Sequence, residues 1–232
     1  MRWLVVLLIL SLAGCATKMG KDGRTQTTVD VKYLVKSDVD RIADTARAEV
    51  IGGLLLIADK LYKRNPKELK KGTAVSREAA VDRLRQRNSR SWPEFGGLRE
   101  RQAAALAFSS AYDGDRVAAL AYGLLTMVDA AFEHKEEFYI LDSLDETKLY
   151  NCARNMEIAV WKLSTDRDPA GNLYLLSNEL DPANRNISFE REFGRITGLL
   201  DFMAKIVADR NGRTLSRTAQ AIATMIFLPV SF

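Results

Sequence analysis

The feature that most constrains the fold is an apolar seam in the last quarter of the chain. Its members, spaced four, three, four, three and four residues apart, are Phe189, Phe193, Ile196, Leu200, Met203 and Val207. This period places all six on one face of an α-helix, as in the seams that helix bundles bury. Ser188 is in position to cap the start of this helix and Gly212 to end it. The sequence therefore predicts a helix that needs other helices to cover it.

Further stretches show the same period. The expected helices cover residues 37–63, 76–87, 98–112, 116–132, 145–163 and 215–228, with Ser76 opening the second, Asp145 or Ser143 starting the fifth and Pro229 closing the last. Ser37 with Asp40, and Asn65 with Glu68 after Pro66, have the spacing of capping pairs. Gly52 and Gly53 lower the stability of the first helix, and their lack of a side chain would allow another element to pack closely against it. Residues 116–132 are apolar on nearly all sides, which predicts a central position in the core.

Strand signals are few. Val29 to Val35 partly alternates apolar and polar residues, which predicts a short strand. Leu173 to Leu176 follows a turn at Asp168 to Asn172 and could form a second strand, either in a small hairpin or paired with Val29 to Val35. Residues 138–144 fit neither pattern. No repeat of fixed period occurs, which disfavours a regular solenoid. The predicted fold is mostly α, a single helical-bundle-like domain of seven or eight helices with at most a short β-hairpin.

The amino-terminal stretch has the composition of an export signal. Arg2 precedes the apolar run Leu4 to Leu10, which is too short to span a membrane. The ending Leu12-Ala13-Gly14-Cys15 resembles the lipobox of bacterial lipoproteins, which implies lipidation of Cys15. The expected domains are a signal peptide at 1–14, a lipidated tether at 15–28 and a helical periplasmic domain at 29–232.

The resemblance also implies a location. Ala16, which follows the cysteine, is similar to the outer-membrane sorting signal of such lipoproteins. We therefore expect the protein to be held at the outer membrane by its lipid and to face the periplasm. Nucleic acid is excluded as a partner by that location, although the formal net charge is +4.

Charge is distributed unevenly along the chain. Residues 60–101 contain 13 Lys or Arg against 5 Asp or Glu, whereas residues 113–146 contain 9 acidic residues against 2 Lys or Arg. The two blocks could pair inside the fold or face different partners. The basic block fits a solvated face, an acidic partner or phosphate-rich lipid headgroups.

Catalytic and metal-binding patterns are sparse. The sequence has neither a Gly-x-Ser-x-Gly elbow nor a phosphate-binding glycine loop, and His134 is its single histidine. No metal or cofactor is expected. Cys152 falls in an apolar stripe, which favours a buried, inert thiol. Carboxylates that a cell-wall hydrolase would need occur in the acidic block, at Glu133, Glu136, Glu137, Asp142 and Asp145.

The best candidate binding residues lie on the helix that begins at Asp145. Beside its apolar stripe this helix carries Tyr150, Asn151, Arg154, Asn155, Glu157 and Trp161. Arg154 and Glu157 are three residues apart and can pair on one face. These side chains either line a polar ligand or partner site or form a network between helices that fixes their register.

Two local resemblances add to this interpretation. Ala58, Asp59, Leu61 and Tyr62 with the run Lys63-Arg64-Asn65-Pro66 resemble a patch of the TatT family of periplasmic lipoproteins, which implies helical hairpins and association with TRAP-type transport. The stretches 137–145, 149–163 and 188–194 are similar to an uncharacterised group of proteobacterial outer-membrane lipoproteins. Neither resemblance carries a catalytic or ligand residue over to this chain.

Three functions are consistent with these features. The first is a non-enzymatic scaffold or assembly partner in the cell envelope, anchored by lipid to the membrane and bound to an envelope protein. The second is a helical small-molecule-binding component associated with transport. The third, a cell-wall hydrolase, would need two opposed carboxylates in a cleft.

Overall fold

The computed structural model describes residues 17–19, 25–27, 36–90, 92–139, 142–179, 181–212 and 227–230. Cys15, the expected strand at residues 29–35 and most of the expected helix at 215–228 lie outside these ranges. None of the helices in them is long and apolar enough to cross a membrane.

The described part confirms a mostly helical single domain. Its elements are β1 (Thr17–Met19), β2 (Thr25–Thr27), α2 (Asp38–Arg64), α3 (Pro66–Leu69), α4 (Arg77–Arg85), the 3-10 helix η2 (Pro93–Phe95), α5 (Glu100–Leu106), α6 (Arg116–Ala131), α7 (Glu146–Thr165) and α8 (Ser188–Arg210). The two strands pair antiparallel, with Lys18 opposite Gln26. They lie within the stretch expected to be a tether.

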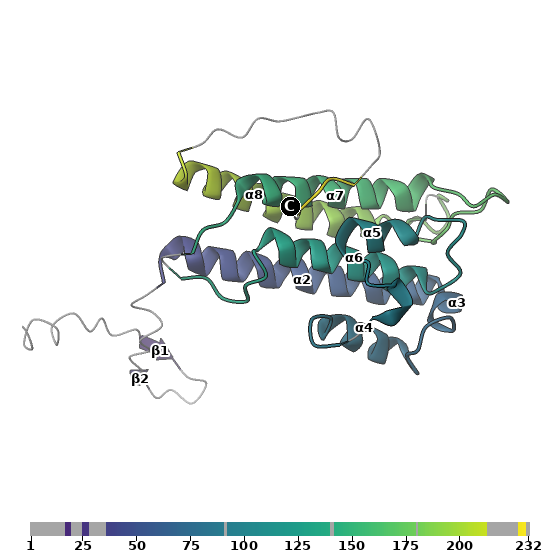
Figure 1. Ribbon diagram of the computed structural model, residues 1–232, viewed down its shortest axis with the longest axis horizontal. Coiled ribbons are helices and arrows are strands. Elements are labelled where there is room, and N and C mark those ends of the chain that lie inside the picture. Colours follow the sequence, from purple (N-terminus) through teal and green to yellow (C-terminus); the bar gives the residue numbers. More distant parts are fainter. Residues whose placement is uncertain are drawn as a thin grey trace, which may run out of the picture.

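The long helices form two layers (Figure 1). Helices α7 and α8 lie side by side, α8 also packs on α2, and α6 lies between α2 and α5, with α4 on the far side of α2. All six residues of the α8 seam are buried, as predicted. Gly53 marks the point where α2 and α8 approach closely, because a Cβ there would lie 3.0 Å from the Ile196 side chain.

Helix α6 is the centre of the core, which confirms the sequence prediction. All 16 of its residues are buried. Its close approach to α5 depends on Gly123, where a Cβ would lie 2.3 Å from the backbone nitrogen of Ala104 and 2.6 Å from the carbonyl oxygen of Glu100. Helix α5 therefore packs with its backbone directly against α6.

A buried carboxylate ties α6 to two other elements. Asp129 is fully buried and accepts hydrogen bonds from Arg47 of α2 (3.0 Å), Arg87 (2.7 Å to Nε) and Asn88 (3.0 Å). Arg87 belongs to the basic block and Asp129 to the acidic block. The two blocks therefore pair inside the fold at this point.

The expected caps are partly right. Ser37 and Asp40 form a complete capping box at the start of α2, and Ser76 and Asp145 cap α4 and α7. Asn65, however, makes no capping bond with its side chain. Its amide instead donates to the carbonyl oxygen of Leu176 (2.8 Å) and accepts from the Leu176 N–H (2.8 Å), which ties a distant loop to the end of α2.

Four other boundaries differ from expectation. Ser188 is the first residue of α8 and makes no capping bond; Ile187 occupies the cap position. The helix expected over 98–112 ends at Leu106, because the Arg116 guanidinium binds the carbonyl oxygens of Leu106, Ala107, Ser109 and Tyr112 and so holds the chain in a turn. Residues 173–176 form no strand, only a bridge between Arg167 and Leu173. Residues 227 and 228 are not helical.

Candidate functional site

The structure distributes the predicted binding residues of α7 over separate contacts. Arg154 bridges α7 to α8 by pairing with Asp201 (2.6 Å), pairs with Glu157 (3.1 Å) and lies over the ring of Tyr150 (4.9 Å to the centroid). Trp161 is 37% exposed. Tyr150, Arg154 and Glu157 thus take part in a network between helices.

Asn151 binds the carboxyl-terminal segment 227–230. Its side-chain amide donates to the carbonyl oxygen of Pro229 (3.0 Å). One turn further along α7, the buried Asn155 donates to the carbonyl oxygen of Leu228 (2.8 Å) and accepts from its N–H (2.6 Å). Phe227 and Val230 are buried on either side. The polar stripe of α7 therefore holds the chain's own tail.

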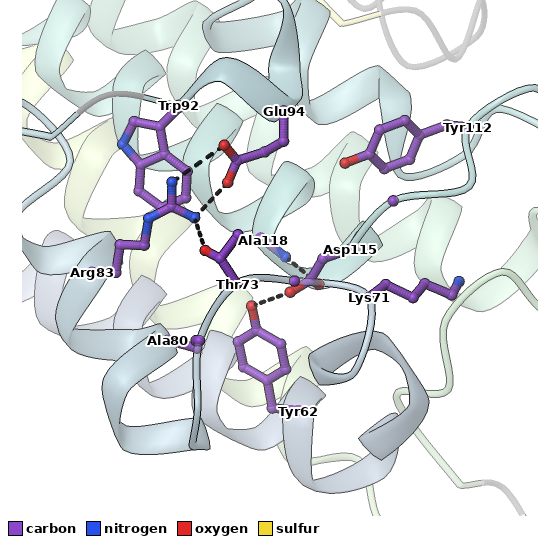
Figure 2. Close-up of a pocket in the computed structure, with 13 residues that line it drawn as sticks. Tyr62, Lys71, Thr73, Ala80, Arg83, Trp92, Glu94, Tyr112, Asp115 and Ala118 are labelled. Atoms are coloured by element: carbon purple, nitrogen blue, oxygen red, sulfur yellow. Dashed lines mark hydrogen bonds and ion pairs between the residues drawn. The ribbon is translucent and has the colours of Figure 1, made fainter.

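A cavity of about 220 Å³, drawn in Figure 2, lies beside the carboxyl-terminal part of α2. It is enclosed by the end of α2, the loop before α4, α4 itself, the loop containing η2, and the start of α6. Its lining comprises Tyr62, Lys71, Gly72, Thr73, Ala74, Ala80, Arg83, Trp92, Glu94, Tyr112, Gly114, Asp115 and Ala118. No residue of the predicted α7 set is among them.

Asp115 forms the floor of this cavity together with Tyr62. The tyrosine hydroxyl donates to one carboxylate oxygen (2.8 Å), and the Ala118 N–H donates to the other (2.9 Å), so that Asp115 also caps α6. Burial raises the pKa of Asp115 from 3.8 to about 6, because the charged form loses its hydration. Gly72 permits this packing, since a Cβ there would lie 2.9 Å from the carboxylate.

The opposite wall is a stacked ion pair. The Arg83 guanidinium lies 3.9 Å from the centroid of the Trp92 ring, pairs with Glu94 through both of its terminal nitrogens, and donates to the Thr73 hydroxyl (3.2 Å). Trp92 is in turn stacked on Phe95, with ring centroids 5.5 Å apart. This wall is rigid, because each of its polar groups is held by a partner.

Tyr112 closes the cavity from a third side. Figure 2 shows its hydroxyl pointing into the space that Glu94 and Asp115 border. That oxygen is buried and has no hydrogen-bond partner within the described part of the chain. Burial raises the pKa of Tyr112 to about 12. A buried hydroxyl without a partner is costly, so a bound molecule that supplied one would gain affinity.

The geometry suits binding better than hydrolysis. A glycosidase needs one carboxylate free to attack or to activate water and a second that gives up a proton. Glu94 is neutralised by Arg83, and both oxygens of Asp115 are accepting hydrogen bonds from the protein. Four of the five carboxylates noted in the sequence serve other contacts: Glu133 pairs with Lys148, Asp142 with Lys135 and Glu137 with Lys36, and Asp145 caps α7.

Other candidate groups lie away from the cavity. His134 is exposed at the end of α6, and the described residues contain no cluster of three or more groups suited to a metal ion. Cys152 is fully buried, and burial raises the pKa of its thiol, so it is not a nucleophile at neutral pH. Its burial agrees with its place in the apolar stripe.

Comparisons with known proteins give no relative from which to infer the site. No family model matches the chain, and no match is found among curated proteins or among solved structures. The assignment of function therefore depends on the residues themselves.

Proposed function

We propose that the chain is a lipid-anchored, non-enzymatic scaffold or assembly partner of the bacterial cell envelope, held on the periplasmic face of the outer membrane. The Leu12 to Cys15 lipobox pattern and Ala16 support the anchor and its location. The bundle provides a rigid body that follows the tether expected at residues 15–28. The binding partner would be an envelope protein with an acidic surface.

The observation that carries this proposal is a basic flank formed by Lys67, Lys70, Arg85 and Arg90. All four side chains are exposed: Lys67 lies in α3, Arg85 in α4, and Lys70 and Arg90 follow these helices, of which α3 lies at the end of α2 and α4 packs along α2 (Figure 1). None of the four has an acidic partner within the described residues. Three neighbouring arginines of the same block, by contrast, form ion pairs with Asp59, Glu94 and Asp129. Exposed charges of one sign attract an oppositely charged surface.

Crosslinking of the native, lipidated protein in cells, followed by mass spectrometry, tests the proposal. A recurrent envelope protein should be captured by the wild type and lost from Lys67→Glu/Arg85→Glu. The matched control is Arg191→Glu/Lys205→Glu, which reverses two exposed charges on α8 and should keep the crosslink. Repeated capture of no protein, or equal loss in both variants, would contradict a role for the basic flank.

Anchoring is tested separately with Cys15→Ser. The variant should not incorporate fatty acid and should be left unprocessed or mislocalised, because the thiol that accepts the lipid is missing. Acyl chains contribute about 0.8 kcal/mol per buried methylene, so two or more chains hold a protein durably at the bilayer. A variant that still labelled with fatty acid and fractionated with the outer membrane would refute the anchor.

The cavity favours a second function, the binding of a small molecule, which is the role that the TatT-like patch suggests. It combines an enclosed volume, aromatic and alanine walls and a few fixed polar groups, as ligand sites do. Tyr62, which lies in that patch, is part of the lining. A ligand should raise the melting temperature of the wild type but not of Ala80→Leu, in which the added side chain fills the cavity.

A further inference from the structure

Asp115 differs from three other buried carboxylates of the core. Asp40, Glu68 and Asp129 each pair with a cation, namely Arg210, Lys71 and the two arginines at Asp129. Asp115 is only 6% exposed, yet its partners are neutral donors and it has no cationic partner among the described residues. A buried carboxylate without a counter-charge is unfavourable.

The cations around Asp115 are committed elsewhere. Lys71 pairs with Glu68 at 2.6 Å, and Figure 2 shows its amino group directed away from Asp115. Arg83 pairs with Glu94 across the cavity. Arg116, the next residue in the chain, binds backbone carbonyl oxygens. The pairs formed by Lys71 and Arg83 cancel in charge, which leaves the negative charge of Asp115 facing the cavity.

We propose that this cavity binds a small molecule that carries a protonated amine, with the ammonium group on Asp115 and the apolar part against Ala80, Ala118 and the ring of Tyr112. This inference names the ligand class of the second function above and depends on it. The carboxylate oxygen that accepts from Tyr62 has a lone pair left, so an ammonium can donate to it without displacing Tyr62.

The remaining polar group of the cavity fits the same ligand. The unpartnered Tyr112 hydroxyl can accept a second ammonium proton or bond a hydroxyl elsewhere on the molecule. A neutral ligand would leave Asp115 without its counter-charge, and an anion would add a repulsive charge to the site. The cavity should therefore select a cation over molecules of equal shape.

Three probes of nearly equal size and different charge test the selection: 2-phenylethylamine, 2-phenylethanol and phenylacetate. Calorimetric titration of the full chain at pH 7.5 should show the amine binding at least tenfold more tightly than the alcohol, and the carboxylate more weakly still. Equal or weaker binding of the amine would overturn the amine inference but leave the cavity as a ligand site. Binding of none of the three to folded protein would overturn both.

Asp115→Asn assigns the selectivity to one residue. The amide keeps an oxygen for the cap or for Tyr62 but removes the charge, so amine and alcohol should bind equally. Asp145→Asn is the matched control, because Asp145 also caps a helix but lies outside the cavity; it should keep the preference. Retained selectivity in folded Asp115→Asn would contradict the inference.

The wild type alone supplies a test that does not depend on how the variant folds. With a pKa of about 6 for Asp115, lowering the pH from 7 to 5 should weaken amine binding about tenfold, since the cation binds the ionised carboxylate. Neighbouring Glu68 and Glu94 are ion-paired and Tyr62 and Tyr112 stay neutral over this range. The alcohol should show no such dependence, and amine binding that did not change with pH would overturn the inference.

Discussion

Gly123→Ala should be among the most destabilising single-methyl additions in this chain. On an exposed helix the same change stabilises by up to about 1 kcal/mol, because alanine has the higher helix propensity. At Gly123 the new Cβ would lie 2.3 Å from the Ala104 nitrogen, 2.6 Å from the Glu100 carbonyl oxygen and 2.7 Å from the Ala104 Cα. All three neighbours are backbone atoms, so no side chain can rotate away.

The magnitude follows from what must move. To reach an ordinary contact distance, α5 has to shift by about 1 Å from α6, which opens the packing along that whole interface. Overpacking of a core typically costs about 1–3 kcal/mol and more where the backbone is forced to move. After the gain in propensity is subtracted, we expect a net loss of about 2 kcal/mol in the free energy of unfolding.

Gly198→Ala provides the matched control. Gly198 is also inside a long helix, α8, but a Cβ there would have no heavy atom within 4 Å. Urea denaturation followed by circular dichroism should show this variant slightly more stable than the wild type, and Gly123→Ala clearly less stable. If Gly123→Ala were as stable as the wild type, the proposed backbone contact between α5 and α6 would be wrong.

Three further predictions concern single polar contacts. Asn155→Ala loses both hydrogen bonds to the tail, so it should cost about 2 kcal/mol and make residues 227–230 cleavable in limited proteolysis, whereas exposed Asn184→Ala should not. Asp129→Ala leaves two arginines without their counter-charge and should cost about 3–5 kcal/mol in urea denaturation; a loss under 1 kcal/mol would contradict its role. Burial raises the pKa of Asp115 to about 6, so the stability that its neutral form gives below pH 4 is lost as pH rises through 6. Between pH 4 and pH 7 the free energy of unfolding of the wild type should fall by up to about 3 kcal/mol more than that of Asp115→Asn. If both proteins showed the same pH dependence in denaturation experiments, this prediction would be refuted.

The helices could be predicted because their signals are local and repeated. The α8 seam and the all-apolar α6 need only a period and a composition, and both have the predicted burial. Ser37 and Ser76 cap as expected, and of the two expected starts Asp145 rather than Ser143 caps α7, because a cap joins residues two or three positions apart. The capping prediction for Asn65 was wrong because its side chain bonds the backbone of Leu176, 111 positions away. No local sequence pattern contains that partner.

The candidate site could not be predicted for the same reason. Its side chains come from five segments that the fold brings together, and each segment has an ordinary local explanation. Asp115 is part of a turn, Trp92 of a loop, and Tyr62 of an apolar helix face. The polar residues of α7 were predicted as a binding site because they lie beside an apolar stripe. In the structure Arg154 binds Asp201, and Asn151 and Asn155 bind the carboxyl-terminal segment 227–230. A signal based on composition finds polar groups and does not find their partners.

Asp115 and Asp129 illustrate how tertiary partners, which the sequence does not reveal, decide the role of a buried aspartate. Both belong to the same acidic block, both are buried, and both lie on α6 or at its start. Arginines from α2 and the loop after α4 reach Asp129 and turn it into a structural contact. No cation of the described residues pairs with Asp115, and an open volume lies beside it instead. Because burying a lone charge opposes folding, such a residue needs a compensating reason to be there, and a cationic ligand in the adjoining cavity supplies one.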